Sequence, residues 1–531
     1  MSAVHRETGE IAWAEWGPEV FARAKAEEKP ILLHIGATWC HWCHVMDLDT
    51  WSRPNVARIV AERFIAVRVD TDHRPDVNER YNQGGWPSIA ILDAGGEVLV
   101  GRLYMPPHEA IPLLLSATDP AQRWSVAVRP EEPPGAPIVS AEVYAAVQKA
   151  YDPYHGGFGE IEKFPHTQVT EWLLDRRQRG QDEGGMLAPS LAGMAGRGLV
   201  DVEEGGFFRY CTQDDWTVPH YEKLLEDQAR LVRLFVRADV HRPVVAAAVR
   251  WMIGTLWRDE VLAFAGSMDA DEAYYARPLA TRGEPPSVDP TVVAGWNGLA
   301  ITALVHAGCA WERPGLLSLA RRAAGSLLTL VDAEGAVHRT RGGIVGLAED
   351  QASVAQAFLV LAQVDGDSAW LDAGARVLGW ARSHLVDGRG GFMDSRPLDE
   401  GLLRQARRSL HANAALGEAA WRFGVISGDA SWLAMATEAG EAALAEGDRY
   451  GFMAAPAAAL AERLTRTSVL VKVNDDGLTR RLYNAVDSEV IVLRVRQGVP
   501  TGKAMACGPK SCALPTSDIE ELRRQIEQLR R

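Results

Sequence analysis

The run Ile31-Leu-Leu-His-Ile-Gly-Ala-Thr-Trp-Cys-His-Trp-Cys-His44 decides the fold of the first part of the chain. Its apolar beginning, Ile31 to Gly36, predicts a short buried strand that ends at a glycine. Residues 37–39 make a loop, and a helix is expected from Cys40 to about Asp49. The two cysteines of the C-x-x-C pattern therefore stand in the first turn of a helix that directly follows a strand.

The residues that follow continue an alternation of strands and helices. Residues 65–70 alternate apolar and polar side chains and predict a second strand, and 88–92 with 97–101 predict a hairpin around Asp93-Ala-Gly-Gly96. Helices are expected at 54–63, 75–81 and 106–115. The order βαβαββα, with C-x-x-C at the start of the first helix, is the thioredoxin arrangement.

This placement predicts thiol chemistry. Unpaired N–H groups and the dipole at a helix N-terminus favour a thiolate, so a lowered pKa is expected for Cys40. Cys43, one turn later, would resolve a mixed disulfide. Gly84-Gly-Trp-Pro87 precedes a strand, where thioredoxin-like folds carry a cis-proline beside the cysteines. The candidate catalytic residues are Cys40, Cys43, Pro87, His41 and His44, and the candidate substrate contacts beside them are Trp39 and Trp86.

Other interpretations of the pair stay open. The pattern C-x-x-C-H also matches haem attachment, which needs export, but the N-terminus lacks the layout of a secretory signal. A zinc site would require Cys40, Cys43, His41 and His44, all neighbours at one helix start, to converge on one tetrahedral ion. A domain that keeps the fold without turnover is the last alternative. We predict a redox or thiol-binding pair, with no metal and no cofactor.

Length and composition limit the class of protein. The 531 residues allow two to four domains, and 47% hydrophobic with 24% charged residues is ordinary globular material. A net charge of −14 argues against a nucleic-acid partner. No apolar run approaches the ~20 residues of a membrane helix, so a cytoplasmic protein is expected. Six cysteines are too few for a disulfide scaffold, and Cys211 and Cys309 are expected to be buried.

After a proline-rich stretch at 125–140, predicted to be a linker, the chain has helical periodicity and a recurring loop signature. Copies of this signature lie about 50–70 residues apart, which fits one helical hairpin per repeat. Six copies predict an (α/α)6 barrel. The copies are His155-Gly-Gly-Phe158, Glu204-Gly-Gly-Phe207, Val261-Leu-Ala-Phe264, Glu334-Gly-Ala-Val337, Arg389-Gly-Gly-Phe392 and Arg449-Tyr-Gly-Phe452.

Polar and aromatic side chains near these loops are candidates for a pocket at one end of the barrel. For Asp350, helix capping is an equally good interpretation. The candidate substrate-binding residues are His166, His220, Glu222, Lys223, Asp227, Asp269, Asp271, Trp296, Asn297, Asp350 and His411.

The C-terminal segment predicts strands at 468–473 and 489–495, a helix near 479–484 and a third strand at 504–506. For Cys507 and Cys512, structural thiols are favoured over a pair. A capping box at Thr516 and Glu520 predicts a final helix. The expected domains are a thioredoxin-like domain at 1–124, the linker at 125–140, the barrel at 141–462 and an α/β segment at 463–531.

Taken together, these motifs resemble the thioredoxin-domain-containing family typified by bacterial YyaL and mammalian spermatogenesis-associated protein 20. The resemblance implies a thioredoxin-like domain followed by a six-hairpin, glycosidase-like toroid, and it names no reaction. The chain departs from the family in a shorter stretch between Asp271 and Trp296. The matching stretches include Cys40-His-Trp-Cys-His-Val-Met46, Gly84-Gly-Trp-Pro87, Gly156-Gly-Phe-Gly159, Lys163-Phe-Pro165, Gly205-Gly-Phe-Phe-Arg-Tyr210, Val218-Pro-His-Tyr-Glu-Lys-Leu-Leu225 and Trp296-Asn-Gly-Leu299.

Three functions follow as hypotheses. The first is a thiol–disulfide oxidoreductase-type protein fused to a ligand-binding barrel, with a thiol or disulfide substrate and a thioredoxin-type reductant. The second is a carbohydrate-active isomerase, epimerase or hydrolase, in which His220 and His411, or Asp269 and Asp350, supply acid–base catalysis on a sugar-like molecule. The third is a non-catalytic ligand-binding redox sensor.

Overall fold

The structure is a computed structural model that describes residues 10–119, 136–445, 447–487 and 489–531. The chain divides into two compact units, of which the first comprises residues 1–133 with the short segments 269–271 and 397–406. Most of the linker predicted at 125–140 lies outside the described residues. Among the described residues, no helix is long and apolar enough to cross a membrane.

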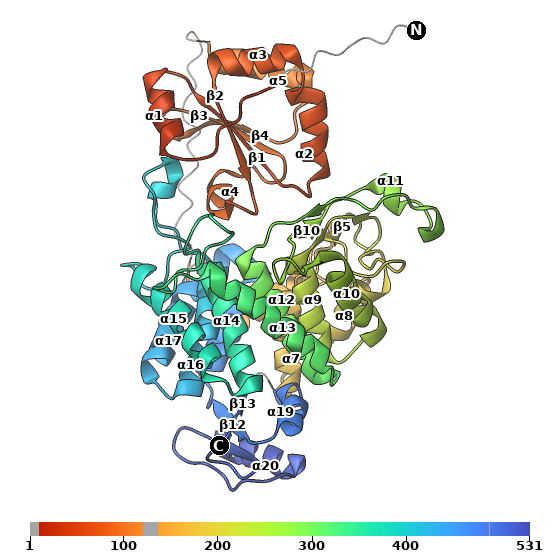
Figure 1. Ribbon diagram of the computed structural model, residues 1–531, viewed down its shortest axis with the longest axis vertical. Coiled ribbons are helices and arrows are strands. Elements are labelled where there is room, and N and C mark those ends of the chain that lie inside the picture. The colour runs from red at the N-terminus through yellow and green to blue at the C-terminus, as the bar shows by residue number, and fades with distance from the viewer. Residues whose placement is uncertain (1–9, 120–135, 446, 488) are drawn as a thin grey trace. The chain divides into compact units, whose positions relative to one another are not determined.

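The described part of the first unit holds a four-stranded sheet in the order β2-β1-β3-β4 (Figure 1). Strands β1 and β2 are parallel, and β3 and β4 continue the sheet in antiparallel fashion. The predicted order βαβαββα is confirmed, with one further helix, α1, in front. The strands are β1 (Ile31–Gly36), β2 (Ile65–Asp70), β3 (Ser88–Leu92) and β4 (Val98–Arg102), and the helices are α1 (Pro18–Ala26), α2 (His41–Met46), α3 (Pro54–Arg63), α4 (Pro75–Tyr81) and α5 (Pro107–Ala117).

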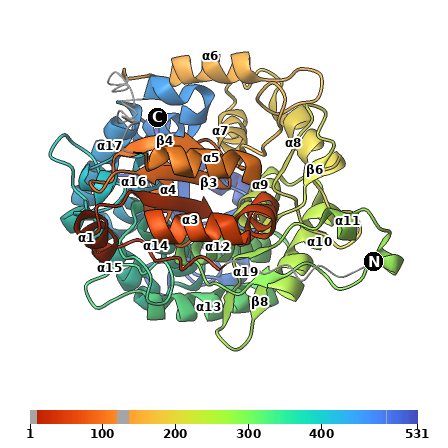
Figure 2. The same ribbon diagram turned by 90° about the horizontal axis from the view of Figure 1, so that it is seen from above.

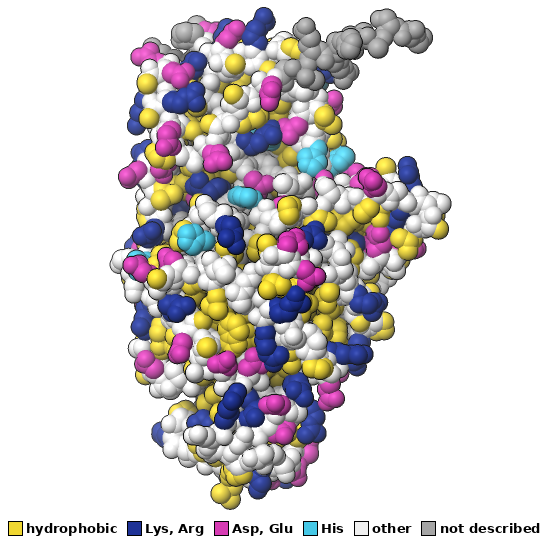
Figure 3. Space-filling view, in the orientation of Figure 1, with side chains coloured by type: hydrophobic (Ala, Val, Ile, Leu, Met, Phe, Trp, Pro, Cys, Tyr) yellow, Lys and Arg dark blue, Asp and Glu magenta, His cyan; other side chains and the backbone are white. Residues whose placement is uncertain are grey.

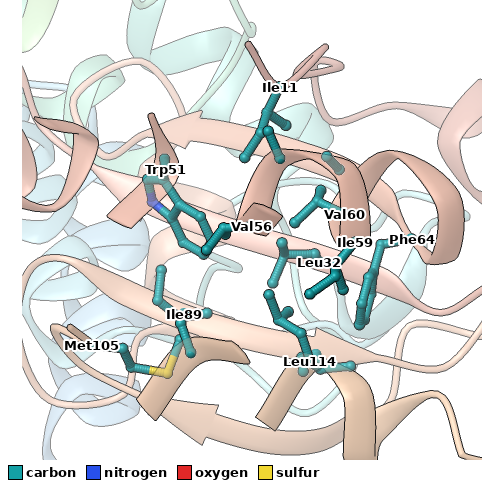
Figure 4. Close-up of a cluster of buried hydrophobic side chains, with 14 of the residues drawn as sticks. Ile11, Leu32, Trp51, Val56, Ile59, Val60, Phe64, Ile89, Met105 and Leu114 are labelled. Carbon is teal, nitrogen blue, oxygen red and sulfur yellow. The ribbon is translucent and has the colours of Figure 1, made fainter. Parts of the chain in front are cut away.

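The central strand β1 is buried on both faces, which is why its sequence is apolar almost throughout. Leu32 packs on one face against Val60 of α3, Phe64 directly after α3, and Leu114 of α5 (Figure 4). Ile31, Leu33 and Ile35 point to the other face, toward α1 and α4. His34 is the one polar side chain of this strand, and it lies on the same face as Leu32.

The second unit is a toroid of paired helices, as the loop signature predicted. The described inner helices form a closed ring in which each contacts its two neighbours, and α18 meets α7. The outer helices α8, α10, α13, α15, α17 and α6 lie around this ring (Figure 2). The inner helices are α7 (Thr167–Gln178), α9 (Leu225–Ala238), α12 (Ala294–Ala310), α14 (Ala348–Asp365), α16 (Leu410–Ser427) and α18 (Ala455–Leu464). Their outer partners are α6 (Ser140–Ala150), α8 (Leu187–Gly196), α10 (Arg242–Trp251), α13 (Pro314–Leu327), α15 (Ser368–His384) and α17 (Ala430–Leu444).

Five of the six loop signatures form small hairpins, but the sixth does not. In each of the five, the last residue of the signature pairs with a residue before it, as Phe158 does with Tyr151 and Phe207 with Val200; the other pairs are Trp257–Phe264, Val331–Val337 and Val386–Phe392. The sixth copy lies instead in a 3-10 helix, Gly447–Ala454. The prediction of an equivalent sixth loop is wrong. Only residues 445–454 join α17 to α18, which is too short for a hairpin followed by a segment that leads back to the next inner helix.

The C-terminal segment closes one end of the toroid. It contains β12 (Val469–Val473), α19 (Asp476–Tyr483), β13 (Val490–Arg494), β14 (Ala504–Cys507) and α20 (Ile519–Arg530). Gln363 of α14 donates to the carbonyl of Val492 at 2.9 Å, and Trp421 of α16 donates to the Ser468 hydroxyl at 3.0 Å. These contacts cover the C-terminal ends of the inner helices.

Two details of this segment differ from the sequence-based expectation. Cys507 and Cys512 form a disulfide, so the preference for separate thiols is wrong. Their positions pair directly across a bridge next to β14, which the spacing alone does not show. The last helix is capped by Asp518, whose carboxylate accepts from the N–H groups of Glu520 and Glu521, and not by Thr516.

Beneath this segment, the interior of the toroid is filled by ion pairs between inner helices. Asp175 of α7 accepts from Arg237 of α9 at 2.5 Å and from Arg463 of α18 at 3.3 Å. Arg179 bonds Glu462 and also lies 3.1 Å from Glu489. Because the C-terminal ends are covered and filled in this way, a pocket in the toroid is to be sought at the N-terminal ends of the inner helices.

Candidate functional site

Cys40 occupies the N-cap position of α2, as the sequence predicted. Its backbone is extended, and its Sγ accepts a hydrogen bond from the backbone N–H of Cys43 at 3.2 Å. The two cysteines form a disulfide, and both residues are buried. A sulfur in this position receives a helix N–H, which also donates to the Cys40 carbonyl at 3.0 Å, and a helix N–H aimed at the sulfur stabilises a thiolate once the disulfide is reduced.

The residues around the pair are held by specific contacts. The indole N–H of Trp39 donates to Oδ2 of the buried Asp72 at 2.8 Å. The Trp39 ring meets Trp86 edge to face at 5.6 Å between centroids. The bond between Trp86 and Pro87 is cis, as expected. Trp39 is almost fully buried, so it supports the loop more than it offers a surface to a substrate.

Three side chains near the pair are exposed: Trp42, His44 and Leu48. Trp42 lies between the two cysteines in sequence, is half exposed and meets Tyr104 edge to face. Trp42 was not among the expected site residues, although an indole inside the C-x-x-C pattern is a visible signal. His41 is partly buried in the first turn of the same helix.

His44 Nδ1 lies 3.3 Å from the carboxylate of Asp269. Asp269 and Asp271 belong to the first unit, whereas Asp350 belongs to the second. All of these carboxylates were expected in a barrel pocket because they follow barrel elements in the chain. The structure instead gives Asp269 a partner on the helix that carries the cysteines.

One buried histidine on β1 was missed by the sequence analysis. His34 is 2% exposed, and its ring lies between Trp13 and Trp51. Burial, together with the nearby Arg68 guanidinium, lowers the pKa of His34 to about 3. Its imidazole is therefore neutral at physiological pH. A histidine in an otherwise apolar strand next to C-x-x-C was the signal that could have identified it.

The second unit carries a separate group of candidate residues at the N-terminal ends of the inner helices. His220 stacks on Tyr210 at 4.5 Å between centroids, and Tyr210 stacks on Phe164 at 4.4 Å. His220 Nδ1 lies 3.3 Å from Oε1 of Glu222. His166, which begins α7, has its pKa lowered to about 4 by burial and by Lys163.

The first turns of α9 and α14 contribute carboxyl groups to this end of the toroid, which we call the carboxylate cluster: Glu226, Asp227, Glu349 and Asp350. Burial, reinforced by Glu226, raises the pKa of Asp227 to about 7. Desolvation and the charge of Glu226 also raise the pKa of Glu349, although this residue is exposed. The pKa of Asp350 is raised by burial in spite of its ion pair with Arg339 at 3.0 Å.

Positive and neutral groups complete this region. Arg230 donates to Glu226 at 2.7 Å. His411, at the start of α16, has its pKa lowered to about 4 by burial and by the charge of Arg230. The structure thus brings Asp227, Asp350 and His411 into one electrostatically coupled region, with Glu226, Glu349 and Arg230 as members that the sequence analysis did not select.

Other predicted pocket residues have structural partners. Lys223 is fully buried and binds Asp201 at 2.7 Å and the Gly205 carbonyl at 2.8 Å. Lys163 has the same relation to Asp152, at 2.9 Å. In both cases the aspartate also accepts backbone N–H groups of its own loop signature. These lysines anchor loops.

Asn297 also anchors a loop. Its amide oxygen accepts from the N–H of Phe264 at 2.9 Å, and its amide nitrogen donates to the carbonyl of Phe264 at 3.0 Å. The same two-way bond joins Gln228 to Phe207 and Asn413 to Phe392, and Gln351 accepts from the N–H of Val337. Each of these amides belongs to an inner helix and clamps the last residue of a loop signature. Trp296, beside Asn297, is buried.

A cavity of about 750 Å³ lies elsewhere in the second unit, between α10 and the segment that follows β10 (Ser267–Met268). Its walls include Trp251, Tyr274, Pro285 and Glu204. The two lone cysteines are buried in the second unit, as predicted, and burial raises the pKa of both Cys211 and Cys309 to about 12. On the face shown in Figure 3, acidic and basic side chains are interspersed.

Comparison with known proteins gives relatives for both parts of the chain. Residues 4–116 match the family model Thioredox_DsbH, described as "Protein of unknown function, DUF255". Spermatogenesis-associated protein 20 of Homo sapiens is 31% identical over 268 residues, which cover 43% of this chain and 34% of that protein. The chain therefore spans about a third of the length of the curated relatives it first matches.

Two further similarities concern one domain each. A crystal structure of D-mannose isomerase superimposes with a TM-score of 0.47 and 12% identity, over 61% of this chain and 96% of that one. Thioredoxin H-type of Fagopyrum esculentum is 37% identical over 87 residues, 16% of this chain and 68% of that protein. The resemblance to the spermatogenesis-associated protein 20 group is confirmed, and through its N-terminal domain the chain belongs to the thioredoxin family.

Proposed function

We propose that this protein is a thiol–disulfide oxidoreductase that uses Cys40 as the attacking thiol and Cys43 as the resolving thiol. The observation that carries the proposal is the position of Cys40 at the N-cap of α2, with its Sγ accepting the N–H of Cys43. A low-pKa thiol at a helix start, followed one turn later by a second thiol, is the chemistry of disulfide exchange.

In the reduced protein, the Cys40 thiolate attacks one sulfur of a substrate disulfide. A mixed disulfide forms, and the other substrate sulfur leaves as a thiolate that takes a proton from solvent. Cys43, deprotonated, then attacks Cys40 Sγ, closes the intramolecular disulfide and releases the second substrate thiol. Two electrons pass to the substrate, and an external dithiol of the thioredoxin type restores the Cys40 and Cys43 thiols.

The exposed side chains beside the pair favour a substrate with an apolar surface. Trp42 and Leu48, at 49% and 73% exposure, belong to the turns that begin at Cys40. Two exposed apolar side chains next to the cysteines suit a disulfide in a peptide or protein better than a disulfide in a small hydrophilic molecule.

Turnover of a protein disulfide tests this proposal. With dithiothreitol as the reductant, the wild-type protein should accelerate the reduction of insulin disulfides, and Cys40→Ser should reduce the rate to the uncatalysed one. The matched control is Cys309→Ser, which removes a buried thiol in the other unit and should leave the rate unchanged. A wild-type rate equal to that of Cys40→Ser would contradict the proposal.

The carboxylate cluster supports a second candidate function, acid–base chemistry on a sugar-like molecule in the toroid. The specific observation is that Asp227 has a pKa of about 7, which lets one carboxyl group hold a proton while a neighbour is ionised. Isothermal titration with mannose, glucose and cellobiose tests for a ligand. Binding that Asp227→Asn and Glu349→Gln both weaken tenfold or more would support this function, and no binding by the wild type would remove it. Binding without turnover would instead support the redox-sensor hypothesis.

A further inference from the structure

The side chains of His34 and Cys43 both lie close to Gly36 in the first unit. Side chains two residues apart on a strand share a face, so the His34 ring lies next to the bare Cα of Gly36 at the end of β1. A Cβ built on Gly36 would be 3.4 Å from Cys43 Sγ and 3.6 Å from His34 Nε2. A glycine here leaves the space between the ring nitrogen and the sulfur free of a side chain.

The contacts of His34 determine which ring nitrogen carries its proton. Nη2 of Arg68 lies 3.2 Å from His34 Nδ1. Since a guanidinium can only donate, Nδ1 must accept, and the proton of the neutral ring is on Nε2. Arg68 is itself fixed, because it forms an ion pair with Asp47 and stacks over Trp13 at 4.8 Å.

The Nε2–H group has no hydrogen-bond partner among the described residues while the disulfide is closed. A buried donor without a partner is costly, and native structures rarely keep one without a reason. The ring is 2% exposed and its lowered pKa keeps it neutral, so it is a fixed donor over the physiological range. The sulfur of Cys43 lies near the same position beside Gly36 as this donor does.

We propose that His34 is a redox-linked hydrogen-bond donor, whose Nε2–H stabilises the Cys43 thiolate that forms when the Cys40–Cys43 disulfide opens. This inference rests on the proposed oxidoreductase function, because only disulfide exchange would use such a donor. Its test measures a pKa and does not require turnover. His34 is a positioning residue for the exchange, because Cys43 performs the chemistry.

The balanced step is the reductive half of the cycle. A reductant thiolate attacks Cys40 Sγ, the bond between Cys40 and Cys43 breaks, and Cys43 leaves with the electron pair as a thiolate. His34 donates its Nε2–H to this thiolate and keeps the proton. The reductant and Cys40 are then joined in a mixed disulfide, which a second reductant thiol resolves.

The charged and titratable groups around the ring are Arg68 of β2, Asp47 through Arg68, and Cys43 of α2. Asp47 and Arg68 compensate each other, so the ring contributes a dipole and not a net charge. Replacing His34 should therefore change the pKa of Cys43 and leave that of Cys40, which is governed by the helix N-terminus.

The test is the pKa of Cys43 in Cys40→Ala, followed by thiolate absorbance at 240 nm. Cys211 and Cys309 have pKa values raised to about 12, and Cys507 and Cys512 are paired, so a thiolate signal between pH 5 and 10 is expected from Cys43 and from no other cysteine. His34→Leu should lower the thiolate-to-thiol ratio about tenfold at a given pH. His34→Gln, which keeps a donor near the position of Nε2, should restore most of it.

Gly36→Ala provides an independent variant that leaves His34 in place. The backbone of Gly36 suits any residue, and the new methyl group would make ordinary contacts with both His34 Nε2 and Cys43 Sγ. Gly36→Ala should therefore lower the thiolate-to-thiol ratio of Cys43, as His34→Leu does. The matched control is His306→Leu, which removes a partly buried neutral histidine of the second unit and should change nothing.

A measurement on the wild type keeps the inference falsifiable if these variants do not fold. In protein labelled with ¹⁵N-histidine, the His34 proton should be on Nε2, and its resonance should move downfield when the disulfide is reduced. A proton on Nδ1, an unchanged resonance, or a Cys43 thiolate ratio that changes less than twofold in His34→Leu would overturn the inference. If His34→Leu lowers the Cys43 thiolate-to-thiol ratio as expected but the wild type does not accelerate insulin reduction, only the proposed oxidoreductase function is overturned.

Discussion

The Sγ of Cys40 accepts the backbone N–H of Cys43 at 3.2 Å, so the first cysteine of the pair caps the helix that carries the second. Capping satisfies one of the N–H groups that every helix start leaves unpaired. For a sulfur the same contact favours negative charge. The most direct chemical consequences of the structure therefore concern the order in which the two cysteines react.

Cys43→Ser should trap the substrate on Cys40. Without the resolving thiol, the mixed disulfide between Cys40 and a substrate persists, whereas Cys40→Ser should form no such adduct at an appreciable rate. Mass spectrometry of the protein after exposure to oxidised glutathione would locate the added tripeptide. An adduct on Cys43 in Cys40→Ser that forms as fast as the one on Cys40 would reverse the assigned roles.

Asp152 should stabilise the second unit in a pH-dependent way. Burial alone would raise its pKa, but the Lys163 ammonium and the N–H groups of Tyr154 and His155 lower it to about 2. Because this value lies below the ~3.9 of an unfolded aspartate, its contribution is present above pH 4 and is lost as the pH falls toward 2. The contribution amounts to about 2–3 kcal/mol.

Calorimetric unfolding of Asp152→Asn measures this effect. The variant should lose about 3–5 kcal/mol at pH 7, because the buried Lys163 keeps its charge without a partner, and the difference from wild type should shrink below pH 4. Asp332→Asn is the matched control, since the Asp332 carboxylate accepts the backbone N–H groups of Glu334, Gly335 and Ala336 in another loop signature, and these three contacts involve no lysine. An equal loss in both variants would show that the ion pair contributes nothing.

Asp227 should have the opposite effect on stability. Its pKa in the folded protein, about 7, is above the unfolded ~3.9, so ionisation of Asp227 opposes folding increasingly as the pH rises from 4 to 7. Asp227→Asn should raise the melting temperature of the second unit at pH 8 and leave it unchanged at pH 4.5. Glu226→Gln should give a smaller gain, because it removes a charge that raises the pKa of Asp227 but also breaks the ion pair with Arg230. A lower melting temperature for Asp227→Asn at pH 8 would contradict this account.

Asn297→Asp should destabilise the second unit by about 2–4 kcal/mol at pH 7. The new carboxylate cannot donate to the carbonyls of Phe264 and Val293, and it places a charge where the side chain is fully buried. Chemical denaturation would measure the loss. Asn55→Asp, an exposed change in the first turn of α3, should alter stability by less than about 0.5 kcal/mol. If Asn297→Asp lowers the stability no more than Asn55→Asp does, Asn297 does not anchor the loop and is again a candidate for substrate binding.

The fold was predictable because its signals are local. The apolar strand before Cys40 and the cis-proline loop at Pro87 identify the thioredoxin arrangement within about sixty residues. The repeated loop signature predicts the toroid for a similar reason, since each copy marks one helical hairpin. The signature does not show which side chains hold the loops in place. Asn297 and Lys223 are recognisable in the sequence only as polar residues near loops. Their hydrogen bonds to buried backbone groups show that they anchor those loops.

The candidate sites were less predictable because they depend on long-range proximity. Asp269 was grouped with Asp350 by sequence position, yet its contact is His44 in the first unit. The high pKa of Asp227 arises from burial beside Glu226, which no sequence pattern encodes. His34 was overlooked because a single polar residue in a strand carries no motif, and its role becomes visible only through Gly36 and Cys43.

The pKa of Cys40 tests the central claim most directly. It can be measured in reduced Cys43→Ser from the pH dependence of the rate of alkylation by iodoacetamide, located at Cys40 by mass spectrometry. The account predicts a value at least one unit below the ~8.5 of a free cysteine, because the helix N-terminus stabilises the thiolate. A value of 8.5 or higher would contradict the assignment of Cys40 as the attacking thiol.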